Sequence, residues 1–265
     1  MPEPIRVGVF GAGGRMGQTV CKAVCDDPAL DLVAAVDPHH AGLDLRSVTG
    51  IDHNSMQVAA AAEELLRQRV QVAVDFTRIE AARENMAFLA DNGIHAVVGT
   101  SGFTEADYAQ LAASFTSSNC VVAPNFAVGA VLMTRFAELA APFFETAEII
   151  ELHHDQKVDA PSGTSVHTAE RMAAASADWA DDPTTDHTID GARGAAGAAG
   201  IPIHSVRLRG IVAHQEVLLG TTGQTLTIRH DSYDRTSFMP GVLLAVKRVA
   251  DLPGLTVGLD SVLGI

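Results

Sequence analysis

The sequence predicts an α/β protein in which an N-terminal, Rossmann-type, doubly wound parallel sheet is joined to a second α+β domain with an open mixed sheet. Short apolar runs alternate with helical patterns over the first half of the chain, which is typical of a parallel sheet. A glycine-rich turn at residues 11–17 follows the first apolar run. Later, three strand patterns between residues 203 and 230 follow one another without helices, which indicates an antiparallel or mixed sheet.

The chain opens with a strand, a glycine turn and a helix, the arrangement that binds a dinucleotide. The β-branched run at residues 5–10 leads into Gly11, Gly14 and Gly17, and a helical pattern follows. Glycines let the backbone approach a pyrophosphate at the helix N-terminus. Because Met16 stands where the third glycine of G-x-G-x-x-G belongs, the spacing is G-x-x-G-x-x-G. A glycine-rich turn alone is weak evidence for dinucleotide binding, but its position between a strand and a helix strengthens that prediction.

A second strand at residues 32–36 ends at Asp37. A carboxylate at this position can accept hydrogen bonds from the ribose hydroxyls of an adenosine. The alternative is an ordinary strand-end residue before Pro38. We favour the ribose contact, because the strand follows the glycine turn at the spacing of a dinucleotide-binding unit.

Strands and helices then alternate. Helices are expected at residues 59–68, 80–92 and 105–116, and strands at 70–76, 95–99 and 120–123. Polar turns that contain Thr77, Thr100 and Asn125 follow these strands. Since ligands of such sheets bind beyond the carboxyl ends of the strands, the turns are expected to point at one crevice. Each turn, taken singly, is also typical of a routine cap.

The remaining pattern predicts a second domain and a return to the first. Helices are expected at residues 129–144, 165–175 and 238–250, strands at 148–152, 203–212, 215–219 and 224–230, and a mobile loop or lid around 191–197 within the polar segment 179–200. We therefore expect a dinucleotide-binding domain at residues 1–127 with 236–265. Residues 128–235 are expected to form a substrate-binding and oligomerisation domain.

The stretch at residues 151–164, Glu-Leu-His-His-Asp-Gln-Lys-Val-Asp-Ala-Pro-Ser-Gly-Thr, says most about function. The flanking patterns place His153, His154 and Lys157 on a strand end and loop, and Thr164 at a helix start. A helix N-terminus offers N–H groups and partial positive charge, which suit a carboxylate. A His-His pair or a Pro-Ser-Gly-Thr turn alone is more often structural. Together they predict a site for a small polycarboxylate with proton-transfer groups beside it.

Composition narrows the function classes. The formal net charge of −14 argues against nucleic-acid binding, because a phosphate backbone needs a basic face. No apolar stretch reaches membrane-spanning length, and the N-terminus lacks the apolar core of a secretory signal. Cys21, Cys25 and Cys120 lack zinc-ligand spacing. We therefore expect no metal site, no membrane partner, no disulfide and a cytoplasmic protein.

The motif at residues 151–164, together with Gly-Ala-Gly-Gly-Arg-Met-Gly at 11–17, resembles the 4-hydroxy-tetrahydrodipicolinate reductase (dihydrodipicolinate reductase) family. The likeness continues in order through residues 75–77, 99–103, 124–126, 204–210 and 230–238. It implies an NAD(P)H-dependent oxidoreductase that reduces 4-hydroxy-tetrahydrodipicolinate to tetrahydrodipicolinate in diaminopimelate and lysine biosynthesis. It also implies a homotetramer.

The resemblance further implies roles for single residues. His153 and Lys157 are then the catalytic pair, and His154, Lys157, Gly163 and Thr164 bind the two substrate carboxylates. The expected cofactor contacts are Gly11, Ala12, Gly13, Gly14, Arg15, Met16 and Gly17 at the pyrophosphate, Asp37 at the ribose, and Gly99, Thr100, Ser101, Ala123, Pro124, Asn125 and Phe126 along the cleft. The role implied for His153 and Lys157 is consistent with the chemistry of the reaction. Hydride addition to a C=N system needs a proton, and a suitably placed His or Lys supplies it.

The sequence departs from the family pattern in two places. Ser101 stands where members often have threonine, and Pro38, His39 and His40 follow the ribose acid where some members have a basic residue able to meet a 2′-phosphate. We therefore expect NADH, NADPH or both, with NADH favoured by Asp37. Two other functions stay open: another NAD(P)-dependent reductase or amino-acid dehydrogenase on the same scaffold, and a cofactor-binding sensor without catalysis.

Overall fold

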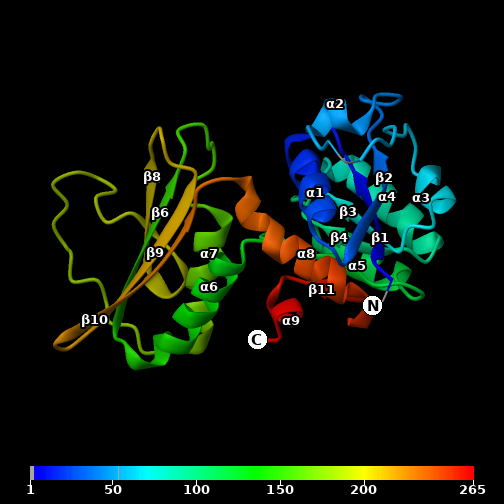
Figure 1. Ribbon diagram of the computed structural model, residues 1–265. Coiled ribbons are helices and arrows are strands. Elements are labelled where there is room, and N and C mark those ends of the chain that lie inside the picture. Colours follow the sequence, from blue (N-terminus) through cyan, green and yellow to red (C-terminus); the bar gives the residue numbers. More distant parts are fainter. Residues whose placement is uncertain (1–2, 53) are drawn as a thin grey trace. The chain divides into compact units, whose positions relative to one another are not determined.

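The computed structural model describes residues 3–52 and 54–265. This part of the chain forms two compact units (Figure 1). Unit 1 comprises the described residues up to Phe126 together with Phe238–Ile265, and unit 2 comprises Ala127–Ser237. The chain therefore leaves unit 1 once and returns to it near its end. Among the described residues, no helix combines the length and the apolar character needed to cross a membrane.

Unit 1 is built on a six-stranded parallel sheet, which confirms the expected Rossmann-type arrangement (Figure 1). The strand order is β11-β5-β4-β3-β1-β2, and each neighbouring pair is parallel. The strands are β1 (Ile5–Phe10), β2 (Leu30–Val36), β3 (Val72–Asp75), β4 (His95–Val98), β5 (Cys120–Val122) and β11 (Leu255–Val257). The helices are α1 (Arg15–Asp26), α2 (Leu45–Thr49), α3 (Glu63–Arg67), α4 (Ile79–Asp91), α5 (Glu105–Ser114), α8 (Met239–Arg248) and α9 (Asp260–Leu263).

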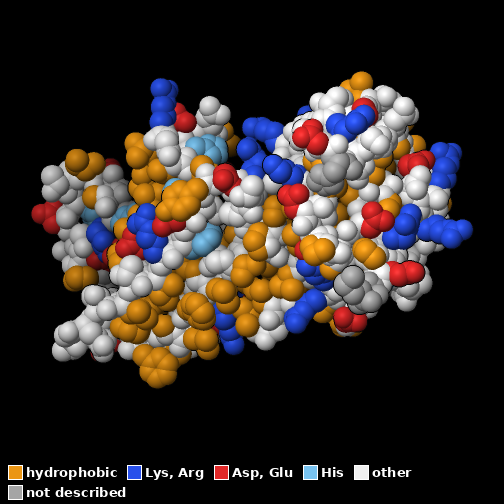
Figure 2. All heavy atoms as spheres, in the orientation of Figure 1, with side chains coloured by type: hydrophobic (Ala, Val, Ile, Leu, Met, Phe, Trp, Pro, Cys, Tyr) orange, Lys and Arg blue, Asp and Glu red, His pale blue; other side chains and the backbone are white. Residues whose placement is uncertain are grey.

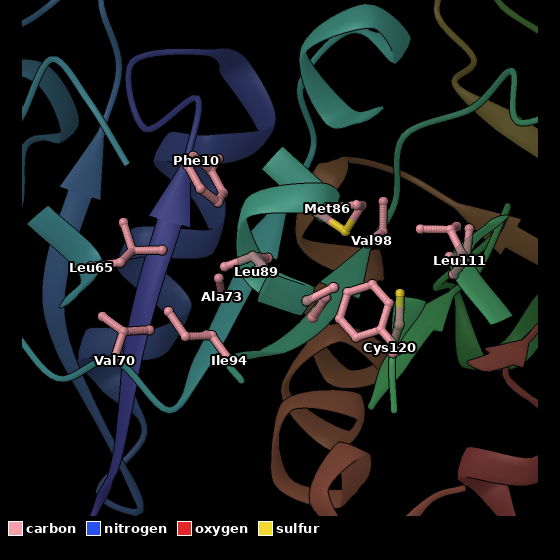
Figure 3. Close-up of a cluster of buried hydrophobic side chains, with 14 of the residues drawn as sticks. Phe10, Leu65, Val70, Ala73, Met86, Leu89, Ile94, Val98, Leu111 and Cys120 are labelled. Carbon is pink, nitrogen blue, oxygen red and sulfur yellow. The ribbon is translucent and has the colours of Figure 1, made fainter. Parts of the chain in front are cut away.

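The core of unit 1 forms because its strands are apolar on both faces, as a sheet covered by helices on both sides requires. On one side α4 packs against α5, and elsewhere α1 packs against α8. Figure 3 shows Met86 and Leu89 of α4 pointing at the sheet, near Ala73 of β3 and Val98 of β4. Leu89 is fully buried, and burial of such a side chain contributes roughly 1.5–3 kcal/mol.

The helix expected at residues 59–68 is shorter than predicted. Only Glu63–Arg67 is helical. Ala59 instead continues as extended backbone that bridges to Val36, and its N–H donates to the Ala35 carbonyl. Pairing with the end of β2 therefore overrides the helical preference of the alanine-rich run.

Three short elements of unit 1 were not predicted: α2, β11 and α9. α2 lies in the segment after Asp37, where no helix was expected. The Asp44 side chain caps its start, and Gly50, in the left-handed conformation, caps its end. β11 lies beyond the last expected helix and pairs with β5 at the edge of the sheet. Its three residues are too few to show a strand period.

Unit 2 carries a five-stranded mixed sheet, as expected (Figure 1). The order is β10-β9-β6-β8-β7, in which β6 and β8 are parallel and the other pairs antiparallel. The strands are β6 (Thr146–His153), β7 (Ala195–Ala196), β8 (Pro202–Arg207), β9 (Ala213–Thr221) and β10 (Gln224–Ser232). Helices α6 (Val128–Ala140) and α7 (Gly163–Ala175) pack together over one face, and α7 makes the crossover between β6 and β8.

The central strand β6 sorts its side chains between the two faces of the sheet. Ala147, Ile149 and Glu151 are buried on the helix-covered face, whereas Glu148 and Ile150 on the other face are half-buried. Ala147 and Ile149 belong to the apolar core of this unit. Glu151 is a charged residue at a core position, and it becomes the centre of the site described below.

The outer side of α6 is apolar. Phe136, Leu139 and, in the 3₁₀ turn that follows, Phe143 are 51%, 54% and 76% exposed. Figure 2 shows hydrophobic side chains gathered on the surface over this helix. Apolar stripes of this kind often mark interaction surfaces.

The glycine-rich segment expected to form a lid is fastened to the sheet. Arg193 donates to Glu148 at 2.5 Å and to Asp182 at 2.9 Å, and β7 pairs with β8. Glu148 lies five positions before His153 on β6, a separation of about 16 Å along a strand. Arg193 therefore holds the segment beside the first half of β6 and not over the histidine.

Candidate functional site in two parts

The turn between β1 and α1 requires glycine for specific geometric reasons. Gly11 has a φ of +65°, in the left-handed region. A side-chain carbon on Gly17 would lie 2.0 Å from the Gly11 carbonyl oxygen, so Gly17 lets the helix pack directly on the turn. Gly14 and Arg15 are exposed where α1 begins. The first turn of this 12-residue helix therefore offers N–H groups to an anion.

Asp37 lies beside this turn. Its Oδ2 accepts a hydrogen bond from the Gly13 N–H and its Oδ1 from the His39 N–H, both at 2.9 Å. The His40 Nδ1 stands 3.2 Å from the same carboxylate, at ion-pair distance but without hydrogen-bond alignment. Burial acts to raise the pKa of Asp37, but His40 and the two N–H groups hold that pKa below its usual value. An ionised, oriented carboxylate keeps lone pairs for a ligand hydroxyl.

The polar turns after β3 and β4 are tied together by Asp75, the buried last residue of β3. Its Oδ1 accepts from the hydroxyls of Thr77 at 2.7 Å and Thr100 at 3.2 Å. Its Oδ2 accepts from the Asn85 side chain at 2.7 Å. The two threonines that the sequence places in polar turns thus hold their loops in one arrangement.

Two aromatic rings pack together among the loops that follow the strands of unit 1. Phe76 and Phe126 lie with ring centroids 5.7 Å apart. A side-chain carbon on Gly99 would lie 1.9 Å from the Phe76 ring, so only glycine fits there. The loops after β3, β4 and β5 therefore meet at one place, as the strand order predicts.

The other residues expected around the cofactor are placed as follows. Arg15, Ser101 and Pro124 are exposed, Met16 and Asn125 are half-buried, and Ala12 and Ala123 are buried. The N–H groups of Ala12 and Ala123 extend the sheet by donating to Val36 and Val98. These two alanines therefore shape the turns through their backbones.

In unit 2, the motif at residues 151–164 forms the end of β6, a loop and the start of α7. His153 is the last residue of β6 and pairs with Arg207 on β8 and Ala213 on β9. The two neighbours fix its backbone. His154 follows at the surface, where its N–H donates to the Val212 carbonyl.

Glu151 organises the side chains at this end of β6. Its Oε2 lies 2.5 Å from the His153 Nδ1, and the Arg207 guanidinium donates to both carboxylate oxygens at 2.8 Å. Burial lowers the pKa of His153, as do Lys157 and Arg207, and Glu151 offsets only part of this effect. The imidazole is therefore neutral near pH 7.

Lys157 lies half-buried in the loop, with its Nζ 2.8 Å and 2.7 Å from the two carboxylate oxygens of Asp159. Because the charges of Lys157 and Arg207 are matched by Asp159 and Glu151, the cluster carries less surplus positive charge than the sequence suggests. A bound carboxylate would share or replace Asp159 as the partner of Lys157.

The start of α7 is capped by Ser162, whose Oγ accepts from the Ser165 N–H at 3.3 Å. Gly163 is exposed, and a side-chain carbon built on it would meet no atom within 4 Å. Thr164 is half-buried. This end of the 13-residue helix is thus open to a small anion beside the loop that carries Lys157.

Sequence reasoning missed three residues that organise the two parts of the site: Asp75 in unit 1, and Glu151 and Arg207 in unit 2. A signal for Glu151 was present, since an acid stands between Ile150 and Leu152 in a strand pattern. Its inward orientation, however, depends on the register of β6 against β8 and β9.

Comparison with known proteins gives a consistent result. The family model described as dihydrodipicolinate reductase, N-terminus, matches residues 5–126, and the one described as dihydrodipicolinate reductase, C-terminus, matches residues 129–263. The chain is 48% identical to the 4-hydroxy-tetrahydrodipicolinate reductase of Corynebacterium urealyticum (98% of this chain and 99% of that protein) and 50% identical to that of Mycobacterium marinum (98% and 100%). The solved structure of dipicolinate-bound dihydrodipicolinate reductase from Paenisporosarcina sp. TG-14 is similar with a TM-score of 0.85 and 41% identity, over 97% of this chain and 99% of that one.

Proposed function

The chain belongs to the dihydrodipicolinate reductase family, and we infer that it catalyses the NAD(P)H-dependent reduction of 4-hydroxy-tetrahydrodipicolinate to tetrahydrodipicolinate in diaminopimelate and lysine biosynthesis. The relatives cover nearly the full chain, so both units are accounted for. The observation that best supports a residue-level account is the cluster of His153, Glu151, Arg207 and Lys157 beside the open start of α7.

We propose that unit 1 binds the dinucleotide, which supplies the hydride when bound. Gly11, Gly14 and Gly17 with Arg15 and Met16 hold the pyrophosphate at the start of α1, and Asp37 accepts hydrogen bonds from the ribose. The loops at residues 99–101 and 123–126, which meet through Phe76 and Phe126, line the nicotinamide end. The places where Gly99 and Gly17 lack a side chain are filled by the Phe76 ring and the Gly11 carbonyl, so these glycines shape the loops around the proposed cofactor.

The substrate is proposed to bind unit 2 through its two carboxylates. Lys157 and His154 offer cationic or N–H donors from the loop, and the backbone at Gly163 and Thr164 offers N–H groups at the start of α7. Charge-assisted hydrogen bonds of this kind are the strong ones. The structure related to this chain that contains dipicolinate shows that a member of the family accepts a planar dicarboxylate.

Lys157 and His153 are proposed to manage the proton. The 4-hydroxyl must first leave as water, which gives a conjugated C=C–C=N system. Hydride addition to this system leaves negative charge spread over the remaining carbon atoms and the nitrogen, which must then gain a proton. The Lys157 ammonium can bind a carboxylate and donate this proton. The neutral His153 ring can then exchange a proton with solvent, because it is only partly buried.

We also propose that the protein is a cytoplasmic homotetramer assembled through unit 2. The half-buried face of its sheet and the edge strand β10 offer surface to another copy, and the apolar stripe on α6 adds to it. Light scattering at micromolar concentration is expected to give a tetramer. A monomer at that concentration would contradict this assembly.

The function is tested by following NADH and NADPH oxidation with enzymatically generated 4-hydroxy-tetrahydrodipicolinate. Rapid, substrate-dependent oxidation is expected. A panel of keto acids with ammonia separates the alternative amino-acid dehydrogenase, which does not need two carboxylate anchors. Tight dinucleotide binding without any oxidation would instead indicate a sensor.

A further inference from the structure

We propose that Glu151 and Arg207 are positioning residues for the reaction. Together they hold the His153 ring with its Nδ1–H toward Glu151 and its Nε2 free for substrate or solvent, and they tie this ring to the first turn of α7. The proposal rests on the proposed function, in which His153 belongs to the catalytic pair.

The Glu151 carboxylate is fully buried and shared among three parts of the fold. Oε2 accepts from His153 Nδ1 at 2.5 Å and from the Arg207 guanidinium at 2.8 Å. Oε1 accepts from the second Arg207 nitrogen at 2.8 Å and from the Ser162 backbone N–H at 3.2 Å. The Ser205 side chain is a further hydrogen-bond partner of this carboxylate. A carboxylate offers about four lone-pair sites, so these donors occupy it and fix its orientation.

Arg207 extends the same network to the loop. One of its terminal nitrogens donates to the Asp159 carbonyl at 2.7 Å, and the Asp159 carboxylate pairs with Lys157. The ion pair between the buried Glu151 and the half-buried Arg207 thus sets the position of the His153 ring, the Lys157 loop and the residue that caps α7. The Glu151–Arg207 pair therefore positions all three groups that are proposed to act on the substrate: His153, Lys157 and the start of α7.

The direction of the hydrogen bond follows from charge. Burial acts to raise the pKa of Glu151, but hydrogen bonds from Arg207, Ser205 and His153 hold that pKa below its usual value, so the carboxylate is ionised and accepts only. The neutral imidazole must therefore carry its proton on Nδ1. Its Nε2 keeps a lone pair, as a group that exchanges protons with a substrate or solvent requires.

Stability alone does not account for this pair. Replacing a buried ion pair by apolar residues of similar volume is often neutral or stabilising, and the two inward positions that precede Glu151 on β6, Ala147 and Ile149, are apolar. The arrangement therefore suits a role in orienting the histidine.

The test variant is Glu151→Gln, whose outcome follows from counting donors. If the amide nitrogen replaces Oε1, it faces two donors, Arg207 and Ser162. If it replaces Oε2, it faces Arg207 as the only obligatory donor, because neutral His153 can turn Nδ1 into an acceptor. The Ser205 hydroxyl adds no obligatory donor in either orientation, because it can donate or accept. The second orientation leaves fewer conflicts, so the variant is expected to move the His153 proton from Nδ1 to Nε2.

Glu148→Gln is the matched control. Glu148 also lies on β6 and contacts both a histidine and an arginine, with His204 Nε2 at 2.6 Å and Arg193 at 2.5 Å, but on the other face of the sheet. Two readouts are compared: the ¹⁵N chemical shifts of the His153 ring nitrogens, assigned with His153→Gln, and the pH dependence of kcat and KM. Glu151→Gln is expected to exchange the two ring-nitrogen shifts and to lower kcat at least ~10-fold with KM within ~3-fold.

The pH profile adds a second signature. The charged groups facing His153 are Glu151, Arg207 and Lys157. Because Glu151 is the one that favours the imidazolium, its neutralisation should shift the acidic limb of the kcat profile to lower pH, whereas Glu148→Gln should leave it in place. If Glu151→Gln does not fold, Glu151→Asp keeps the charge for Arg207 but draws it back from His153, and the same fall in kcat is expected.

The outcomes separate the two proposals. If the wild-type chain does not turn over the substrate, the proposed function fails. If the wild type is active and His153→Gln is impaired, while Glu151→Gln or Glu151→Asp keeps the wild-type kcat and ring tautomer, only the positioning role is overturned. Equal effects of the Glu148 and Glu151 variants would also overturn it, because they would indicate a general effect on the sheet.

Discussion

Replacing Lys157 by Ala tests the proposed site most directly. Lys157 is expected to bind a substrate carboxylate and to donate the proton during reduction. In the part of the chain that the structure describes, Lys157 forms an ion pair with Asp159, whose side chain is 59% exposed. The substitution should therefore remove chemistry while leaving the fold intact.

The magnitude follows from these contacts. Loss of a placed proton donor typically lowers the rate ~10²–10⁴-fold. Loss of a charged hydrogen bond costs ~1.5–3 kcal/mol, but the substrate must share Lys157 with Asp159, so we expect the lower end, about a tenfold rise in KM. An exposed ion pair contributes only about 0–1 kcal/mol to stability, which limits the change in Tm to about 4 °C.

The assay compares three variants in steady-state NADH oxidation. His153→Ala should mainly lower kcat, and His154→Ala, which changes an exposed residue, should mainly raise KM. Lys157→Ala should be more damaging than His154→Ala. The Kd for NADH should stay unchanged in all three, because the glycine turn and Asp37 belong to the other unit.

Two results would refute this reasoning. Near-normal turnover in Lys157→Ala would show that the loop is not the catalytic site. Loss of NADH binding together with turnover would show that the loop supports the fold, and that its cluster of charges is structural.

Three further predictions concern the cofactor, pH and packing. NADH should exceed NADPH in kcat/KM by about 5- to 150-fold, since a carboxylate–phosphate contact at Asp37 costs roughly 1–3 kcal/mol; a clear NADPH preference in parallel assays would contradict this. Burial lowers the pKa of His95 below its ordinary 6.5, so the unfolded chain binds more protons there and Tm should fall as pH drops from 7.5 to 5.5; a flat or rising Tm would count against it. Gly99→Ala should lower the free energy of unfolding by about 1–3 kcal/mol through its clash with Phe76, whereas Gly163→Ala, which meets open space, should leave it nearly unchanged in a urea titration.

The architecture was largely predictable from local patterns. β-branched runs and the glycine turn predicted the parallel sheet, because each strand is buried on both faces and each turn demands glycine locally. β11 and α2 escaped prediction, since three to five residues carry no measurable period. The helix expected from residue 59 was cut short by long-range pairing of Ala59 with Val36.

For the site, the sequence by itself determined which reactive groups stand close together along the chain: His153, His154, Lys157 and the start of α7 all lie within one short stretch. It also determined the glycines of the turn between β1 and α1, whose need for special backbone geometry is a local property. These features depend on residues that are only a few positions apart in the sequence, so a short sequence motif is enough to predict them.

Only the tertiary structure decided what holds those groups in place. Glu151 meets Arg207, 56 positions away, because β6 and β8 pair in parallel with a defined register. A shift of one residue would turn Glu151 to the other face. Asp75 likewise reaches Thr100 only because β3 and β4 are neighbours in the sheet. Contacts between distant segments depend on strand order and register, which are set by the packing of the whole chain and leave little trace in any single stretch of sequence.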